Sequence, residues 1–278
     1  MKKVFVTNLK GEKEPFSAEK VYKSAKRAGA SSALAKEISQ EIKKIVYPGI
    51  QTREIFLRVK QLLRRKDKKA SYRFDLKRAM AKMGPSGFPF EKFIGEIFSF
   101  NGFKTKLNQS IKGKYAIHEV DFVAKKNDFL YIGECKFRHH RGERIDLSVI
   151  LAFSAKFQDI EKGNHFKGSD TKAVIVTNAK FSSQAKNYAK GMDIELLGWN
   201  YPKNKGLEKL IEQHQLYPIT ILPSFKGFLI DVFSKRRTML ARDILQTDLI
   251  SLAKNLNIRE KKLLPIVQEA KILFGRTE

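Results

Sequence analysis

The chain has 278 residues, of which 42% are hydrophobic and 11% aromatic, so it can build real hydrophobic cores and general disorder is excluded. Lysine and arginine number 55 against 29 acidic residues, and the net charge of +26, spread along the whole length, is typical of proteins that bind nucleic acid, although a lysine-rich proteome would give the same excess. The single cysteine, Cys135, excludes an intramolecular disulfide and nowhere do 18 apolar residues follow one another, so we expect a soluble cytoplasmic protein with no membrane span.

The first region, residues 1–83, is predicted to be a small helical domain with one β edge. A short strand at Val4–Val6 and a glycine turn precede Ser17, a residue type that caps helix N-termini. Apolar residues then recur at spacings of three and four, which predicts amphipathic helices. These residues are Val21, Ala25 and Ala28; Leu34, Ile38, Ile42 and Ile45; and Ile55, Val59, Leu62 and Leu63.

The second region, residues 88–202, is predicted to be an α/β domain. Gly84–Pro89 breaks the helical pattern and is the predicted linker before it. An order of helix, three strands, helix, strand, helix and strand is typical of a mixed sheet flanked by helices. The expected elements are a helix at Phe90–Phe100, strands from Phe103, at Ile117–Ala124 and at Phe129–Phe137, a helix at Asp146–Ile160, a strand at Ala173–Thr177, a helix at Ser182–Lys190 and a strand at Ile194–Trp199.

The third region, residues 205–278, returns to a helical pattern. Leu207, Leu210 and Ile211 indicate one helix, and a leucine series from Leu249 to Leu256 indicates another. Basic segments lie between the apolar stretches. A plain helical cap and a compact DNA-gripping unit are equally compatible with this pattern.

Charged residues on two predicted strands of the second region carry the chemistry. Side chains alternate along a strand, so Glu134 and Lys136 point to the same side of an apolar strand. Asp121 lies among apolar residues of the preceding strand, and a hairpin around Lys125–Asp128 would bring it near Glu134. Charges in such positions are costly unless they are paired or bound to a metal.

Two converging carboxylates repel each other unless a cation lies between them, and hard oxygen ligands suit Mg²⁺. A bound metal would make a water molecule more acidic, and Lys136 would orient that water or neutralise developing charge on a phosphate. These parts match phosphodiester hydrolysis. The alternative is a purely structural ion-pair network across the strands.

The second region resembles the Mrr-like branch of the PD-(D/E)xK nuclease superfamily, whose members include restriction endonucleases. Besides the Asp121, Glu134 and Lys136 motif, Phe90–Phe103 resembles the opening helix of the family and Val176–Ala189 its closing strand and helix. The resemblance implies a restriction-endonuclease-like fold, Mg²⁺ or Mn²⁺ as cofactor and DNA as substrate.

By the same resemblance, Asp121 and Glu134 are metal ligands, Lys136 is the catalytic lysine and Glu91 is the opening-helix glutamate that supports metal binding. Glu119, two residues before Asp121, is predicted to assist. Gln158 is a candidate for the glutamine that many family members carry on the next helix. The histidines His118, His139 and His140 are expected at the surface or at DNA phosphates rather than on a metal.

The first region resembles an ATP-cone, a small regulatory domain that binds nucleotides. The similarity rests on Val6, Gly11, the segment Glu14–Val21 and Ala70–Arg73. Asn8 and Leu9 replace two basic residues of the family, with Lys10 one place later. If ATP binds, Lys10, Gly11 and Lys20 are the predicted phosphate partners. A cone without ATP would be a docking or dimerisation module.

The third region resembles helix-hairpin-helix DNA-binding modules around Leu222–Leu245, with Lys235, Arg236 and Arg237 beside it. Such a module contacts phosphates without reading sequence. The combined prediction is a metal-dependent DNA endonuclease with nucleotide regulation. The alternative is a non-cleaving, nucleotide-responsive DNA-binding regulator. A homodimer is expected by analogy, because cutting both strands normally requires two active sites.

Overall fold

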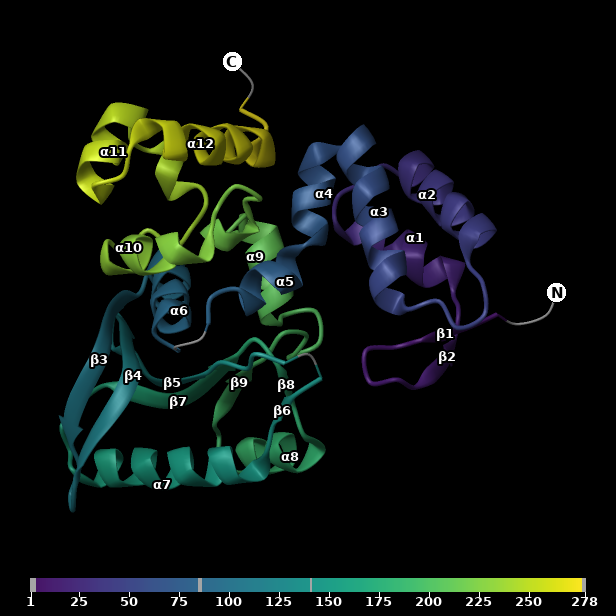
Figure 1. Ribbon diagram of the computed structural model, residues 1–278. Coiled ribbons are helices and arrows are strands. Elements are labelled where there is room, and N and C mark those ends of the chain that lie inside the picture. Colours follow the sequence, from purple (N-terminus) through teal and green to yellow (C-terminus); the bar gives the residue numbers. More distant parts are fainter. Residues whose placement is uncertain (1–3, 85–86, 141, 277–278) are drawn as a thin grey trace.

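The computed structural model describes residues 4–84, 87–140 and 142–276, and its centre is a five-stranded mixed sheet flanked by helices (Figure 1). The strands lie in the order β3-β4-β5-β7-β9. The first three form an antiparallel meander, and β7 and β9 continue it in parallel with β5. The sheet consists of β3 (Lys104–Lys112), β4 (Ile117–Lys126), β5 (Phe129–Lys136), β7 (Asp170–Thr177) and β9 (Glu195–Leu197). The predicted mixed sheet is therefore confirmed.

Helices cover both faces of this sheet. Helix α6 (Phe88–Phe100) lies on one face, and α7 (Leu147–Lys162) and α8 (Ser183–Gly191) lie on the other (Figure 1). A short parallel pair, β6 (Arg144–Ile145) and β8 (Lys180–Phe181), was not predicted. Helix α6 begins two residues earlier than predicted and includes Pro89, because proline is tolerated in the first turn, where its missing N–H has no partner to lose. Residues 85 and 86 of the predicted linker lie outside the described residues.

The β4–β5 hairpin turns where the sequence predicts it. Asn127 adopts a φ of 55° between the two strands, and the register pairs Phe122 with Gly133. Continued by one residue, this register sets Asp121 opposite Glu134. Gly133 has a steric role in that register, because a Cβ atom there would lie 2.1 Å from the ring of Phe122. The hairpin thus brings the two predicted carboxylate residues face to face.

The β3–β4 ladder is interrupted at Asp121. Its residue pairs run through Leu107 with Phe122 and resume at Gln109 with Val120, whereas Asn108 has a φ of 50° and is not paired. Val120 and Phe122 belong to the hydrophobic clusters on opposite faces of the sheet, although residues two apart in a regular strand share a face. The strand is therefore twisted at Asp121, and such local irregularities commonly re-aim a side chain beside an active site.

The first region forms its own small core. The hairpin of β1 (Phe5–Thr7) and β2 (Lys13–Pro15) precedes helices whose N-caps include Ser17 and Ser31. Most of the predicted apolar series is buried, with Ala25, Ile38 and Ile42 in this core, whereas Ile45 is exposed. The helices are α1 (Ala18–Arg27), α2 (Ser32–Ile45), α3 (Thr52–Lys66), α4 (Lys68–Phe74) and α5 (Leu76–Ala81).

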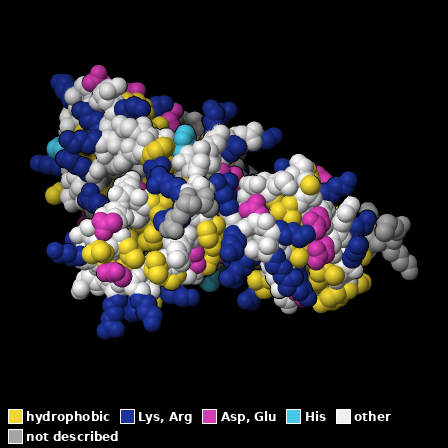
Figure 2. All heavy atoms as spheres, turned by 90° about the horizontal axis from the view of Figure 1, so that it is seen from above, with side chains coloured by type: hydrophobic (Ala, Val, Ile, Leu, Met, Phe, Trp, Pro, Cys, Tyr) yellow, Lys and Arg dark blue, Asp and Glu magenta, His cyan; other side chains and the backbone are white. Residues whose placement is uncertain are grey.

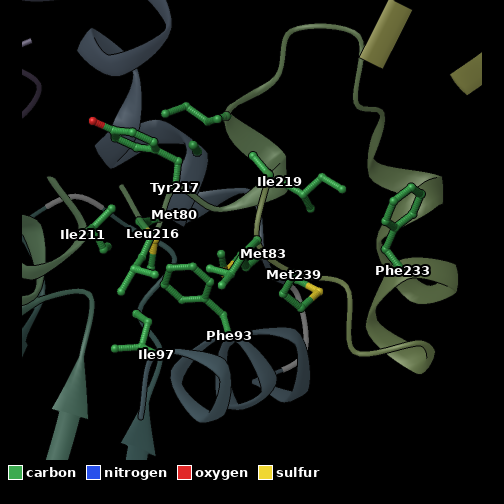
Figure 3. Packing of buried hydrophobic residues seen from close by; sticks show 14 of the residues in the cluster. Met80, Met83, Phe93, Ile97, Ile211, Leu216, Tyr217, Ile219, Phe233 and Met239 are labelled. Carbon is green, nitrogen blue, oxygen red and sulfur yellow. The ribbon is translucent and has the colours of Figure 1, made fainter. Parts of the chain in front are cut away.

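The C-terminal region shares one hydrophobic cluster with α4, α5, α6 and one face of the sheet. Figure 3 shows Met80 and Met83, from the end of the first region, packed with Phe93 of α6 and with Leu216 and Ile219 of the C-terminal region. The helices here are α9 (Leu207–His214), α10 (Ile230–Lys235), α11 (Leu249–Leu256) and α12 (Glu260–Phe274), with 3-10 turns at Ile219–Ile221, Gly227–Leu229 and Asp243–Leu245. Helices α11 and α12 both lie in segments whose sequence pattern is helical, and α10 and the 3-10 turns were not predicted individually.

Buried hydrogen bonds reinforce this cluster. The ammonium of Lys92 donates to the carbonyl of Ser234 at 2.6 Å, and Thr220 donates to the carbonyl of Ala79 at 2.7 Å. Glu96 of α6 accepts a hydrogen bond from the backbone N–H of Met239, and burial raises the pKa of Glu96 to about 8.

Among the described residues, no helix combines the length and apolar character needed to cross a membrane.

The register of the hairpin predicts an effect on stability. Gly133→Ala should lower the free energy of unfolding by about 1–3 kcal/mol, because the added methyl group overlaps a fully buried ring. Urea denaturation measures this change. Gly191→Ala is the matched control: a Cβ there meets nothing within 4 Å, so equal or slightly higher stability is expected. Equal stability of both variants would refute the steric role of Gly133.

Candidate active site

The site lies where β4 and β5 meet, and Asp121 is its first member. The Oδ2 atom of Asp121 accepts a hydrogen bond of 2.6 Å from the backbone N–H of Cys135, one residue beyond Glu134. This bond ties the carboxylate to the neighbouring strand. Burial, followed by the charge of Glu134, raises the pKa of Asp121. The structure therefore brings Asp121 and Glu134 together, as the hairpin predicts.

Glu134 is buried, with 9% of its side chain exposed, and two lysines compensate its charge. Lys136 contacts one carboxylate oxygen at 2.6 Å, and Lys156 of α7 contacts the other at 3.0 Å. The side chains of both lysines are partly exposed, at 34% and 26%. The geometry thus places one buried carboxylate between two ammonium groups that can still reach a bound molecule.

Lys156 was not predicted as a site residue. Its ammonium also donates to the backbone carbonyl of Glu119 at 2.8 Å, so it joins α7 to both β4 and β5. The sequence does carry a signal: Lys156 is the one lysine between Leu147 and Ile160, and it lies beside the buried Phe157. A partly buried charge requires a partner, and Glu134 is that partner.

Glu91 lies near enough to the pair to respond to its charge. Burial, with added repulsion from Asp121 and Glu134, raises the pKa of Glu91 to about 7, and Lys136 acts in the opposite direction. Cys135 lies in the same environment, where burial and the neighbouring carboxylates raise the pKa of its thiol. The carboxyl groups of Glu91, Asp121 and Glu134 therefore lie close enough for their negative charges to repel one another, which favours the protonated forms of Glu91 and Asp121.

A divalent cation fits this donor set. Asp121 and Glu134 offer two hard oxygen donors, and Mg²⁺ is usually held by one or two carboxylates together with water and substrate phosphate. Among the described residues, no three Asp, Glu, His or Cys side chains come together as a complete metal site, so Glu91 is not brought in as a third ligand. Metal binding by Asp121, Glu134 and Glu91 stays a prediction.

The loop after β7 fixes the end of β5. Thr177 is fully buried and its hydroxyl donates to the carbonyl of Lys136 at 2.5 Å. The side-chain amide of Asn178 accepts from the N–H of Arg138 and donates to its carbonyl, both at 2.8 Å. These two residues hold the main chain of the predicted catalytic lysine, a positioning role that the sequence did not indicate.

Other residues singled out in the sequence lie elsewhere. The side chain of Glu119 is exposed, and only the backbone carbonyl of this residue contacts the site, where it accepts a hydrogen bond from Lys156. Gln158 is within hydrogen-bond distance of Ser154, at 3.4 Å, on its own helix. His118 pairs with Asp159 at 2.7 Å and so holds the β3–β4 turn against α7, whereas His139 and His140 are exposed beyond β5.

The three residues predicted to bind nucleotide phosphates, Lys10, Gly11 and Lys20, do not line one cavity. Lys20 lies on the wall of a cavity of about 190 Å³. The apolar part of this wall includes Phe16, Val21 and Ile55. Lys10 and Gly11 are not among the described residues that line it. Instead, the side chain of Lys10 lies beside Gly142, where it would be 3.3 Å from an added Cβ.

Comparisons with known proteins agree with this fold. Residues 81–200 match the family model described as Restriction endonuclease, of the Mrr catalytic type. An uncharacterised protein of Archaeoglobus fulgidus is 35% identical over 182 residues, which cover 66% of this chain and all of the relative. The crystal structure of a protein of unknown function, AF1548, has a TM-score of 0.60 and 30% identity and covers 68% of this chain and all of the solved one.

A more distant similarity is to the MspJI restriction endonuclease in complex with a 27-mer oligonucleotide. The TM-score is 0.36 and the identity 12%, over 60% of this chain and 35% of the solved one. A likeness of this size is too small to assign a fold or a ligand.

The raised pKa of Glu91 predicts a pH-dependent change in stability. The folded protein holds this proton up to about pH 7, whereas the unfolded chain releases it near its ordinary pKa of 4.5, so this group makes stability fall as pH rises between those values. Glu91→Gln cannot ionise. It should match the wild type near pH 5 and exceed its free energy of unfolding at pH 8 by on the order of 1 kcal/mol.

Chemical denaturation at the two pH values measures the difference. Glu119→Gln is the control, since this exposed glutamate should give no pH-dependent gain. If Glu91→Gln were no more stable than the wild type at pH 8, the charge repulsion inferred for the site would be wrong.

Proposed function

Because the chain belongs to the family of the Archaeoglobus fulgidus protein and its residues 81–200 form a restriction-endonuclease domain, we propose that it is a metal-dependent DNA endonuclease. The observation that carries the proposal is the convergence of Asp121 and Glu134 with Lys136 at one end of the β4–β5 hairpin. The net charge of +26 supports a polyanionic substrate.

Hydrolysis of a phosphodiester needs a water oxygen to join phosphorus while one P–O ester bond breaks and the leaving oxygen takes up a proton. Asp121 and Glu134 would hold a Mg²⁺ or Mn²⁺ ion, which acidifies a bound water and stabilises negative charge on the phosphate. Lys136 would place its ammonium beside the attacked phosphate. Lys156 would keep the Glu134 carboxylate oriented from the α7 side.

The rival from a different class is a DNA-binding regulator that does not cut. Lysine and arginine alone serve phosphate binding, and a pure binder gains nothing from two neighbouring carboxylates beside a phosphate backbone. The cost of holding Asp121 and Glu134 in this environment therefore favours the enzyme.

The decisive variant is Asp121→Ala. Cleavage of plasmid and branched DNA with Mg²⁺ or Mn²⁺ should fall by about a hundredfold or more, because a principal metal ligand is lost. DNA binding, measured without divalent metal, should be equal to that of the wild type or tighter, since a negative charge is removed beside the phosphate.

Asp128→Ala is the matched control, because Asp128 is an exposed acid in the turn of the same hairpin. Its cleavage rate should equal that of the wild type. Equal cleavage by Asp121→Ala would refute the proposed site. Absence of cutting by the wild type under every condition, with tight salt-sensitive binding, would favour the regulator.

We further propose that the first region is an ATP-cone and binds ATP or a related nucleotide in the cavity beside Lys20. The observation behind this is that the cavity joins an apolar wall, suited to a base, to the ammonium of Lys20 in the first turn of α1. For a nucleotide to regulate the nuclease, it must bind two conformations or assembly states with different affinities. A cone without nucleotide would serve in docking or dimerisation.

Isothermal titration with ATP tests this site. Lys20→Ala should weaken binding about tenfold or more, because one charge-assisted contact to phosphate is lost. Lys23→Ala is the control: Lys23 lies on the same helix and pairs with Glu19 at the surface. No ATP binding by the wild type, or equal binding by both variants, would contradict the nucleotide site.

The C-terminal region is proposed to add contacts to DNA phosphates through Lys235, Arg236 and Arg237, in the manner of a helix-hairpin-helix module. A homodimer is proposed for cutting both strands. Cleavage of one strand only by a chain that is monomeric in solution would oppose the dimer.

A further inference from the structure

A basic cavity lies just beyond the proposed catalytic lysine, between the first region and the nuclease domain. Its volume is about 220 Å³. The cavity lies past the carboxyl ends of the parallel strands β5 and β7, where open α/β sheets commonly bind ligands. The polar and basic side chains that line it are Lys77 of α5, Arg138, His139 and His140 after β5, and Asn178 and Lys180 after β7.

Charge indicates the kind of ligand. Lys77, Arg138 and Lys180 supply three positive charges, and Glu143 is the one carboxylate among the described residues of the wall. The Glu143 carboxylate accepts a hydrogen bond of 2.9 Å from the backbone N–H of His140. Concentrated positive charge in a concave site favours a compact anion, and phosphate is the anion that nucleic acids and nucleotides present.

The walls of the cavity are fixed by contacts within the protein. Asn178 clamps the backbone of Arg138 by two hydrogen bonds, so the loops after β5 and β7 form one surface. The ring of His139 packs at 86° against Phe137, and a Cβ at Gly84 would lie 2.2 Å from His139. The ammonium of Lys77 lies 5.9 Å above the centre of the Trp199 ring. This anchoring limits the entropy that the cationic side chains would lose on binding a ligand.

The cavity lies close to the proposed chemistry. Arg138 follows Lys136 by two residues of extended chain, about 7 Å at the usual rise of a strand. Successive phosphates on one DNA strand advance by about 3.4 Å along the helix axis. A phosphate in the cavity would therefore belong to the same strand as the attacked one, a small number of nucleotides away. Lysine and arginine side chains also populate both lobes and their junction on the face shown in Figure 2.

We propose that this cavity is a phosphate-binding site that holds a DNA backbone phosphate a small number of nucleotides from the phosphate being cut. The DNA assignment rests on the proposed function. The same chemistry would accept the phosphate chain of a free nucleotide, and Lys10 beside Gly142 brings the turn of the first region to the rim of the cavity. The test below distinguishes these two sources.

The experiment measures binding without cutting. Affinity for a fluorescent duplex is determined with EDTA present, at several KCl concentrations, for the full-length wild type, Arg138→Ala and Lys180→Ala. Each phosphate contact contributes about 0.9 to the slope of log affinity against log salt. Both variants should lower the magnitude of that slope by about this amount. Lys180 is exposed, so its variant tests the proposal even if Arg138→Ala disturbs the Asn178 clamp.

Lys162→Ala is the matched control. It removes the same charge from an exposed position at the far end of α7, where Gly163 packs against the β3–β4 turn. Its salt slope should equal that of the wild type. A parallel titration with ATP in the absence of DNA covers the second source: ATP binding that is lost in Arg138→Ala and Lys180→Ala but kept in Lys20→Ala would show that the cavity takes a free nucleotide phosphate.

Unchanged salt slopes and unchanged ATP binding in both variants would overturn the phosphate site. These outcomes are separate from the nuclease proposal. A protein that nicks DNA while both variants keep the wild-type slope and the wild-type ATP binding refutes the cavity alone, and a protein that never cuts while the slopes fall refutes the nuclease alone.

Discussion

Charge compensation around Glu134 is the constraint on which the rest of the site depends. A carboxylate at the end of an apolar strand is strongly disfavoured unless opposite charges or hydrogen bonds accompany it. Here the compensation comes from two directions, Lys136 on its own strand and Lys156 on the helix below the sheet, while the backbone N–H of Cys135 holds the neighbouring carboxylate of Asp121. Removing any one of these contacts would leave the remaining charges unbalanced.

The same constraint explains several features of the sheet that appear unrelated. Gly133 permits the close approach of β4 to β5, and the unpaired Asn108 allows β4 to twist at Asp121. Thr177 and Asn178 then hold the chain that follows Glu134. None of these four residues carries charge, yet together they determine where the charged groups lie. Neighbouring carboxylates in a partly buried place are costly to fold, and perturbed groups of this kind cluster at functional sites.

The central part of this arrangement could be predicted from sequence because it follows local rules. Alternation along β5 placed Glu134 and Lys136 on one side, and the turn at Asn127 paired them with Asp121. Lys156 could not be placed in the same way, because its partner lies 22 residues away across the packing of a helix on the sheet. Asn108 was missed because a break in a ladder depends on the partner strand.

The hydrophobic cluster that joins α4 and α5 to the C-terminal helices has a consequence for how the protein can be divided. The predicted boundary at Gly84 follows the sequence pattern, but Tyr72, Leu76 and Met80, which precede it, are buried against residues beyond position 200. A chain cut at Gly84 would expose these side chains on one fragment and the groove that receives them on the other. Helices α4 and α5 therefore belong to both units, because Ala70 of α4 is buried in the core of the first region whereas Tyr72, Leu76 and Met80 are buried in the cluster shared with the C-terminal region.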